Sequence, residues 1–254
     1  MNEYQTIQQH KQFDVLLIGD DCIDTYIYGY VNRISPEAPV PVFEPLTQND
    51  KPGMAANVSK NLQALGCRVE YLHGQTSEKT RLIDQRSKQQ ILRIDNDNFS
   101  EPLTFASAIP DSYDAIVVSD YNKGTISYEL VQELRAEFSG PIFVDTKKPD
   151  LDKFNGCYVK INSLEHSRCS TLPDAQWLIV THGSQGAVHM DQQYPTPTVD
   201  VSDVTGAGDT FMSALVYKFL QTQDISQAIV FANQAAGITV QHIGVYAPTL
   251  EEIK

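Results

Sequence analysis

A seven-residue stretch near the carboxyl end holds the residues most capable of chemistry. It is Asp203-Val204-Thr205-Gly206-Ala207-Gly208-Asp209, followed directly by a helical apolar pattern. Glycines at the start of a helix let backbone amides approach a ligand closely, and these free amides favour an anion. The Asp209 carboxylate would lie beside that anion, where it can accept the proton of a substrate hydroxyl. The stretch therefore predicts a phosphoryl-transfer centre; the alternative is a tight turn whose acid complements the helix dipole.

Three other ligand-binding patterns fit the chain poorly. A dinucleotide-binding turn needs a third glycine where Phe211 stands, and a P-loop needs a lysine where Asp209 follows the last glycine. The pattern Asp20-Asp21-x-x-Asp24 also occurs in enzymes of prenyl diphosphates, where the carboxylates share one face of a helix. Here it ends a strand-like run, so that assignment is disfavoured.

The order of apolar segments indicates how the reactive residues are brought together. Short runs rich in Val, Ile and Leu alternate with helical patterns, such as residues 53–65. Runs without polar alternation suit strands covered on both faces, so we predict an α/β fold with three α-β-α layers and a mainly parallel sheet. Ligands of such sheets bind beyond the carboxyl ends of the strands. The strand-like runs are residues 13–19, 67–74, 113–120, 140–146, 156–162 and 176–183.

Two segments depart from this alternation and are predicted to form a small β-flap, or lid, over the strand ends. Residues 25–44 combine aromatic and β-branched residues with Pro36, Pro39 and Pro41. Prolines are tolerated in edge strands, so this segment is expected in edge strands or a flap rather than in the central sheet. Residues 79–95 are expected to fold as a hairpin.

Composition and charge narrow the class of protein. The chain has 254 residues, 41% of them hydrophobic, and a formal net charge of −13, so we expect one domain, residues 1–254, with a substantial core. The acidic balance argues against a nucleic-acid or membrane partner, because such a surface needs a basic footprint. No apolar run could span a bilayer and no C-x-x-C pair occurs, which favours a soluble cytoplasmic protein. The polar residues 1–12 are expected to be a loose leader or an outer helix.

Several motifs, in the right order along the chain, resemble those of the ribokinase-like (PfkB) carbohydrate kinases. The stretch from Asp203 to Asp209 is similar to the D-x-x-G-A-G-D signature of that family. Residues 53–57 are similar to its G-G-x-x-N sugar-binding turn, with Met54 in place of the second glycine. The N-x-x-E element, the T-x-G loop and the adenine-flanking helix are matched by Asn162-Ser163-Leu164-Glu165, by Thr181-His182-Gly183 with Gly186, and by residues 231–237. The resemblance covers roughly residues 13–254.

Within this family the resemblance is greatest to the kinases of heptose 7-phosphate. It rests on Gly19-Asp20 with Asp24, on residues 33–42 (RISPEAPVPV) and on Ser119-Asp120-Tyr121 followed by Lys123-Gly124. The resemblance implies a kinase that uses ATP and Mg²⁺ to phosphorylate the anomeric hydroxyl of this sugar phosphate. A ribose or nucleoside kinase, and a weakly active or inactive relative that only binds a sugar or nucleotide, stay open as alternatives.

The resemblance also implies a role for each motif residue. Asp209 becomes the catalytic base. The anion hole would consist of the backbone amides of Gly206, Ala207 and Gly208. The acceptor sugar would be held by Asp24, Gly53 and Asn57. The nucleotide would be bound by Asn162, Glu165, Thr181, Gly183, Gly186 and Asn233. Asn162 and Glu165 would also hold Mg²⁺ through water, and a monovalent cation is a further candidate.

Two lysines and one histidine near these motifs receive no role. Lys147 and Lys148 follow Asp145 at a strand end, where a lysine can meet a phosphate, but a solvated pair is the favoured interpretation. His182 lies inside the T-x-G loop with no partner visible in the sequence, and it is given no catalytic role.

The chain departs from the family pattern in two places. After Gly74 the family continues with a helix and a strand, whereas here residues 75–78 lead straight to residues 79–81 (KTR). After Glu165 the family has a long helix, and here only a short segment with Pro173 follows. We therefore expect a reduced lid and one reduced flank of the sheet, with the phosphoryl-transfer motifs retained. The active form is expected to be a homodimer, because exposed apolar edges usually find a partner.

Overall fold

A ten-stranded sheet forms the centre of the protein, whose computed structural model describes residues 11–105 and 112–253. Its strands are β1 (Asp14–Ile34), β2 (Pro41–Gly53), β3 (Arg68–Asp84), β4 (Gln90–Asn96), β5 (Ala115–Asp120), β6 (Ile142–Thr146), β7 (Tyr158–Asn162), β8 (Leu178–Thr181), β9 (Ala187–His189) and β10 (Gln192–Tyr194). The α-helices are α1 (Met54–Ala64), α2 (Tyr128–Glu137), α3 (Ser163–His166), α4 (Ala207–Thr222) and α5 (Ile225–Thr239). The 3-10 turns are η1 (Leu151–Phe154), η2 (Ala175–Trp177) and η3 (Gly183–Gln185).

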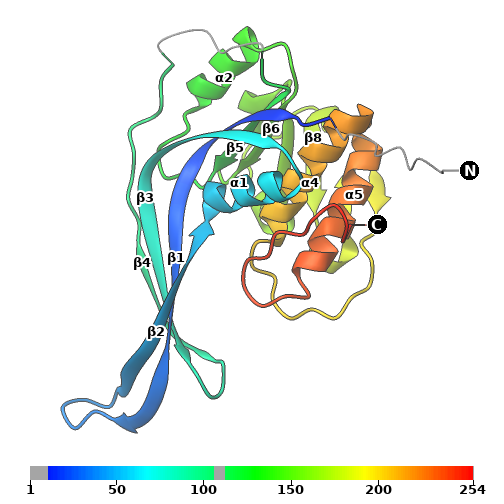
Figure 1. The fold of residues 1–254 in the computed structure, drawn as a ribbon. Helices are drawn as coiled ribbons and strands as arrows, with labels where there is room; N and C mark the ends of the chain where they lie inside the picture. The colour runs from blue at the N-terminus through cyan, green and yellow to red at the C-terminus, as the bar shows by residue number, and fades with distance from the viewer. Residues whose placement is uncertain (1–10, 106–111, 254) are drawn as a thin grey trace, which may run out of the picture.

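The strand order is β10-β9-β8-β7-β6-β5-β1-β3-β4, with β2 paired to β1 (Figure 1). Every neighbouring pair from β8 through β5 and β1 to β3 is parallel, and antiparallel pairs lie at both ends of the sheet. The predicted α/β fold with a mainly parallel sheet is confirmed. Within the described residues, no helix combines the length and apolar character needed to cross a membrane. Of the predicted leader, residues 1–10 lie outside the described part of the chain.

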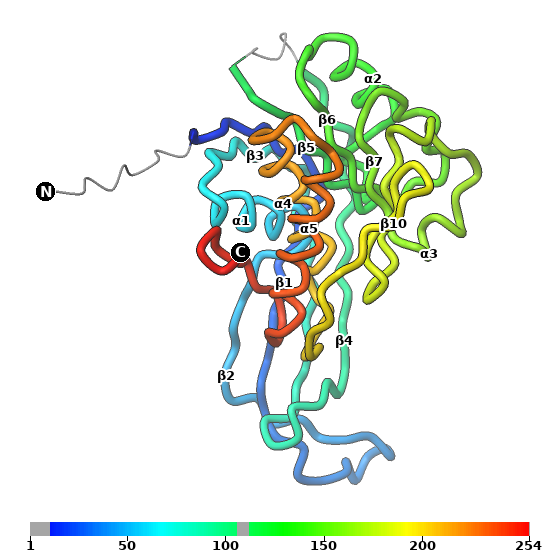
Figure 2. Tube along the Cα trace, turned by 90° about the vertical axis from the view of Figure 1, so that its right-hand side faces the viewer, coloured from blue at the N-terminus to red at the C-terminus, as the bar shows by residue number. Residues whose placement is uncertain are grey.

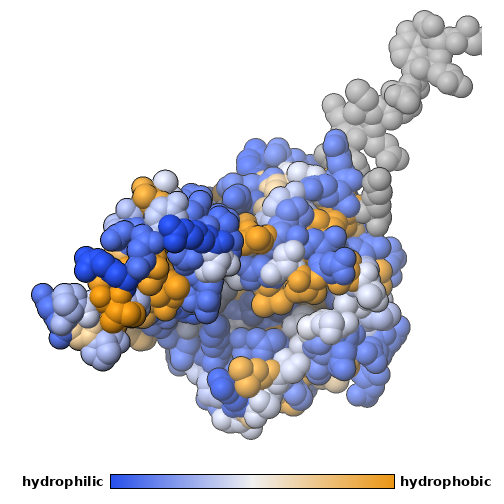
Figure 3. All heavy atoms as spheres, turned by 90° about the horizontal axis from the view of Figure 1, so that it is seen from below, coloured by the Kyte–Doolittle hydropathy of each residue, from blue (hydrophilic) through white to orange (hydrophobic). Residues whose placement is uncertain are grey.

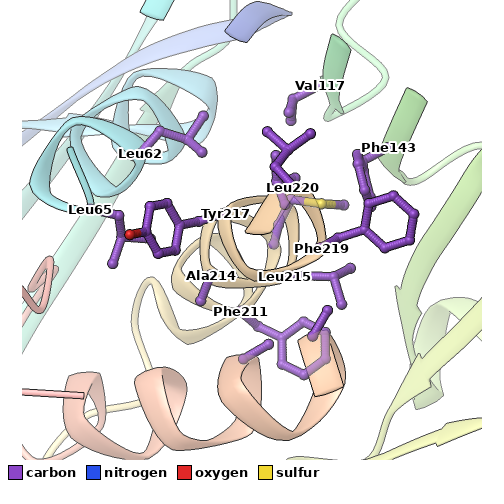
Figure 4. Packing of buried hydrophobic residues seen from close by; sticks show 14 of the residues in the cluster. Leu62, Leu65, Val117, Phe143, Phe211, Ala214, Leu215, Tyr217, Phe219 and Leu220 are labelled. Carbon is purple, nitrogen blue, oxygen red and sulfur yellow. The ribbon is translucent and has the colours of Figure 1, made fainter. Parts of the chain in front are cut away.

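Alternate residues of the central strands pack against opposite helical layers. Val15 and Leu17 of β1 belong to the core that α1, α4 and α5 complete, and Figure 4 shows the side chains of α4 directed into this core. Leu16 and Ile18 belong to a second core on the other face, which α2 and η1 cover. Because both faces are buried, the strands lack the polar alternation of a half-exposed sheet.

β1 is longer than predicted and continues into the flap. The predicted strand at residues 13–19 and the first part of the segment 25–44 form one unbroken strand. Beyond Cys22 this strand pairs with β2 on one side and with β3 on the other. Of the two predicted alternatives, the flap agrees with the structure and the edge strand does not: this part of β1 lies between two strands of the flap, and its Tyr26 is buried. The three prolines of the segment lie beyond β1, in the connection to β2 and at the first residue of β2.

The flap comprises the outer ends of β1 to β4, residues 22–53 and 78–96. β3 and β4 form the hairpin predicted over residues 79–95. Since β5 ends at Asp120 while β1 and β3 continue, the flap extends past the carboxyl ends of the parallel strands (Figures 1 and 2). Exposed apolar side chains gather on it (Figure 3): Ile23, Ile34, Val40, Leu46, Leu92 and Ile94.

Both predicted shortenings are present. β3 passes through Gly74 from the sheet into the flap, with no helix between these two parts of the strand. The helix after Asn162 has only four residues, so α2 and η1 are the main cover of that face of the sheet. The shortened connections leave the glycine-rich stretch at the start of α4 in place.

Candidate active site

Asp209 lies buried in the first turn of α4, beside α1 and the loop that follows β5. The helix begins after Gly206, whose φ of 80° is a left-handed conformation that favours glycine. The Asp209 carboxylate accepts hydrogen bonds from Asn57 Nδ2 at 2.7 Å and from the Tyr121 hydroxyl at 3.0 Å. Burial and the neighbouring Asp209 charge raise the pKa of Tyr121, so this hydroxyl stays protonated and can donate.

Burial also gives Asp209 the proton affinity of a base. Poor solvation of the ionised carboxylate raises its pKa from 3.8 to about 6. The hydrogen bond from Asn57 opposes this rise, the negative charge of Asp145 adds to it, and the positive charge of Lys160 opposes it. A carboxylate with a pKa near 6 is ionised at neutral pH and still accepts a proton readily, which suits general-base catalysis.

Lys160 is a functional candidate that the sequence analysis missed. It lies buried in β7, and its ammonium contacts the carboxylate of Asp145 at 2.6 Å. A Cβ on Gly208 would lie 3.1 Å from Lys160 Nζ, so the cation adjoins the glycine turn. Burial lowers the pKa of Lys160, but Asp145, with the charges of Asp209 and Glu165, raises it above its ordinary value, and the lysine stays charged. The sequence feature that could have identified Lys160 is its position inside an apolar strand. A lysine there is expected to be buried, and a buried lysine nearly always has a partner.

The glycine turn, residues 206–208, separates two regions. On one side, a Cβ on Gly206 would lie 3.0 Å from Asn57 Nδ2. On the other side, Ala207 and Gly208 line a cavity of about 420 Å³. The same cavity is lined by four of the residues predicted to bind the nucleotide: Thr181, Gly183, Gly186 and Asn233. An anion held at the turn would therefore be within reach of ligands in both regions.

The structure also brings Asp24 and Gly53 to the Asn57 side of the turn. Asp24 forms an ion pair with Arg81 at 2.6 Å. A Cβ on Gly53 would lie 2.6 Å from Asp24 Oδ2, so any larger residue would have to displace this carboxylate. Met54, which replaces the second glycine of the family turn, has a φ of 49°, and the glycine-like backbone is thus retained at a cost in strain.

Asn162 and Glu165 lie at the end of β7 but are not part of the cavity lining. They cap α3 reciprocally: Asn162 Oδ1 accepts from the Glu165 amide at 2.9 Å, and Glu165 Oε2 accepts from the Asn162 amide at 2.8 Å. The described residues contain no cluster of three acidic, His or Cys side chains that could hold a metal. A few protein oxygens that leave room for water fit Mg²⁺, which keeps most of its water shell in nucleotide sites.

Asn233 combines a place in the cavity wall with a structural contact. Its side chain is buried, and its Nδ2 donates to the carbonyl of Tyr194 at 2.8 Å. Asn233 is thus a hydrogen-bonded amide of the core, and its position also borders the cavity.

Comparison with known proteins agrees with this geometry. Residues 164–253 match the pfkB family carbohydrate kinases. The chain is 34% identical to "Bifunctional protein HldE" of a Nitratiruptor species, covering 94% of this chain and 64% of that protein. It is 30% identical to the protein of the same name from Pseudomonas putida, covering 98% of this chain and 64% of that one. The family match is confined to residues 164–253, so the chain is similar to PfkB carbohydrate kinases over this part. The chain spans just under two thirds of the length of these two relatives.

Solved structures show that the chain has the ribokinase-like fold. Ribokinase from Thermotoga maritima superposes with a TM-score of 0.71 at 17% identity, covering 95% of this chain and 98% of that one. Arabidopsis thaliana ribokinase, complexed with ribose and ATP, superposes with a TM-score of 0.70 at 14% identity, covering 96% and 98%.

The curated relatives also carry residues that this chain lacks. The alignment with the Nitratiruptor protein has 298 positions, and 94% of 254 residues is about 239, so about 59 aligned positions have no counterpart here. This difference agrees with the two shortened connections, at Gly74 and after Glu165.

Proposed function

We propose that this protein is an ATP- and Mg²⁺-dependent kinase that phosphorylates heptose 7-phosphate at its anomeric hydroxyl. The observation that carries the proposal is the position of Asp209, a carboxylate with a pKa near 6 at a glycine turn between two binding regions. The acceptor is supported by the motif resemblance to heptose 7-phosphate kinases, and by relatives named HldE that match most of the chain.

On the acceptor side, Asp209 takes the proton of the attacking hydroxyl. Asn57 and Tyr121 donate to its two oxygens and thereby orient the carboxylate. As the proton moves to Asp209, the sugar oxygen forms a bond to the γ-phosphorus of ATP, and the bond from that phosphorus to the departing ADP oxygen breaks. Asp24, which lies next to Gly53, would bind sugar hydroxyls.

On the nucleotide side, the backbone amides of residues 206–208 and the ammonium of Lys160 stabilise negative charge on the transferring group. A buried cation is effective there because the surroundings screen it little. Thr181, Gly183 and Gly186 border the cavity that we assign to the nucleotide. Mg²⁺, bound through water by Asn162 and Glu165, would neutralise charge on the nucleotide phosphates.

An acceptor panel tests this proposal. The purified protein is given ATP and Mg²⁺ with heptose 7-phosphate, unphosphorylated heptose, ribose or adenosine, and ADP release is measured. We expect the highest kcat/KM with heptose 7-phosphate. Turnover only with ribose or adenosine would show that heptose 7-phosphate is not the acceptor. Binding of sugars without turnover of any of them would favour a sensor protein over a kinase.

We also propose that the active form is a homodimer in the cytoplasm, with the flap at the subunit contact. The flap exposes Leu46, Leu92 and Ile94, and apolar groups on a projecting sheet are stabilised by a covering surface. Light scattering is expected to give a two-subunit mass, and replacing Leu92 and Ile94 with lysine should give a monomer. A fully active monomeric wild type would refute this assembly.

A further inference from the structure

Two lysines close to Asp209 differ from four other cations near the site. Those four have carboxylate partners within 4.0 Å: Arg81 with Asp24, Lys123 with Asp97, Lys148 with Asp120, and Lys160 with Asp145. Lys79 and Lys147 form no such pair with any residue in the described ranges. The sheet register places Lys79 between Asp24 of β1 and Asp95 of β4, without a contact as short as 4.0 Å to either carboxylate.

Both ammonium groups lie against the ring of Tyr121. Lys147 Nζ is 4.5 Å from the ring centroid, and Lys79 Nζ is 5.8 Å from it. The hydroxyl of the same ring donates to Asp209 at 3.0 Å. The proposed base and the two cations are therefore separated by about the width of one tyrosine side chain.

The sheet register directs Lys79 toward the acceptor region. Lys79 is the partner of Asp24 in the parallel pairing of β1 with β3, and Arg81 follows two residues later. Side chains of paired residues, and of residues two apart, lie on one face of a sheet. Lys79 thus shares its face with the Asp24–Arg81 ion pair. Lys147 comes from the body of the protein, in the loop after β6.

We infer that Lys79 and Lys147 bind the phosphate group that the acceptor sugar already carries. This inference rests on the proposed kinase function and specifies its acceptor as a phosphorylated sugar. Two ammonium groups without a carboxylate within 4.0 Å can bind a phosphate dianion, whereas a neutral sugar has no anionic group to offer them. The attacking hydroxyl would lie at Asp209 and the acceptor phosphate beyond the Tyr121 ring, with one cation from the flap and one from the body.

The experiment compares kcat/KM for heptose 7-phosphate with kcat/KM for unphosphorylated heptose. Lys79→Gln and Lys147→Gln should each lower the ratio of these two values by about 10- to 100-fold, the usual loss for a charge-assisted hydrogen bond. Lys153→Gln removes an equal charge on η1 and should leave the ratio unchanged. Lys79→Arg and Lys147→Arg should retain much of the wild-type ratio, because arginine keeps the positive charge.

A binding measurement covers the case in which turnover is low. Calorimetry on the Asp209→Asn protein should show that Lys79→Gln and Lys147→Gln weaken binding of heptose 7-phosphate more than binding of heptose. An equal loss for both sugars, or a raised KM for ATP with an unchanged sugar ratio, would overturn the inference. Absence of turnover in the wild type with all acceptors, combined with phosphate-dependent sugar binding, would refute the kinase proposal and leave the phosphate site standing.

Discussion

Replacing Asp209 with asparagine is expected to make the protein more stable while it removes activity. Asp209 has a folded-state pKa of about 6 against an ordinary value of 3.8. The folded protein therefore binds this proton more tightly than the unfolded chain does, and ionisation of the carboxylate destabilises the fold as the pH rises from about 4 to 6. Asparagine has a similar shape and carries no charge, so it avoids that cost.

The magnitude follows from the size of the pKa shift. A shift from 3.8 to about 6 corresponds to about 3 kcal/mol at pH 8, taking 1.36 kcal/mol for each pKa unit. By pH 5 the same linkage leaves about half of that difference. We expect Asp209→Asn to raise the free energy of unfolding by about 1–3 kcal/mol at pH 8, because rearranged hydrogen bonds to Asn57 and Tyr121 offset part of the gain.

Urea unfolding of wild type and Asp209→Asn at pH 8 and pH 5 measures this difference, and turnover is expected to fall by about 100-fold or more. Asp203→Asn is the matched control in the same stretch. The pKa of Asp203 is lowered because its hydrogen bonds from Thr205 and Gly244 outweigh its burial. Its ionised form therefore stabilises the fold at pH 8, and the control should be destabilised there. If Asp209→Asn were equally destabilised at both pH values, the carboxylate would not be the strained, desolvated base described above.

Three further outcomes test the remaining roles. The kcat/KM should rise with pH up to about 6 and then level off as Asp209 ionises; a profile flat from pH 5 to 8 would exclude this base. Lys160→Met should lower kcat by about 100-fold, and Lys160→Arg much less, if the buried cation stabilises the transferring group; equal losses would indicate packing alone. Glu165→Gln should raise the Mg²⁺ concentration needed for half-maximal rate, and an unchanged Mg²⁺ dependence would leave Glu165 as a helix cap only.

The sequence predicted features that depend on local patterns. The buried strands followed from apolar runs, and the glycine turn at the start of α4 followed from residue types that only a few backbone conformations accept. Lys160 escaped prediction because its partner Asp145 is set by the register of β6 with β7, and sequence spacing does not reveal register. The course of β1 was missed for a similar reason: the polar Asp20 resembles a strand end, yet its carboxylate is buried and accepts the backbone amides of Tyr121 and Lys123.

Because β1 and β3 run without a break from the central sheet into the flap, the flap is a continuous extension of the sheet and has no hinge loop in these two strands. No loop separates the flap from the sheet in these two strands, so the flap can move only by bending a hydrogen-bonded ladder. The ladder is irregular at one point, between Gly19 and Asp21, and bending would concentrate there. Asp20 lies at that point and holds the backbone of Tyr121, whose hydroxyl touches Asp209. A contact that bends the outer end of the flap would thus change the orientation of the Asp209 carboxylate.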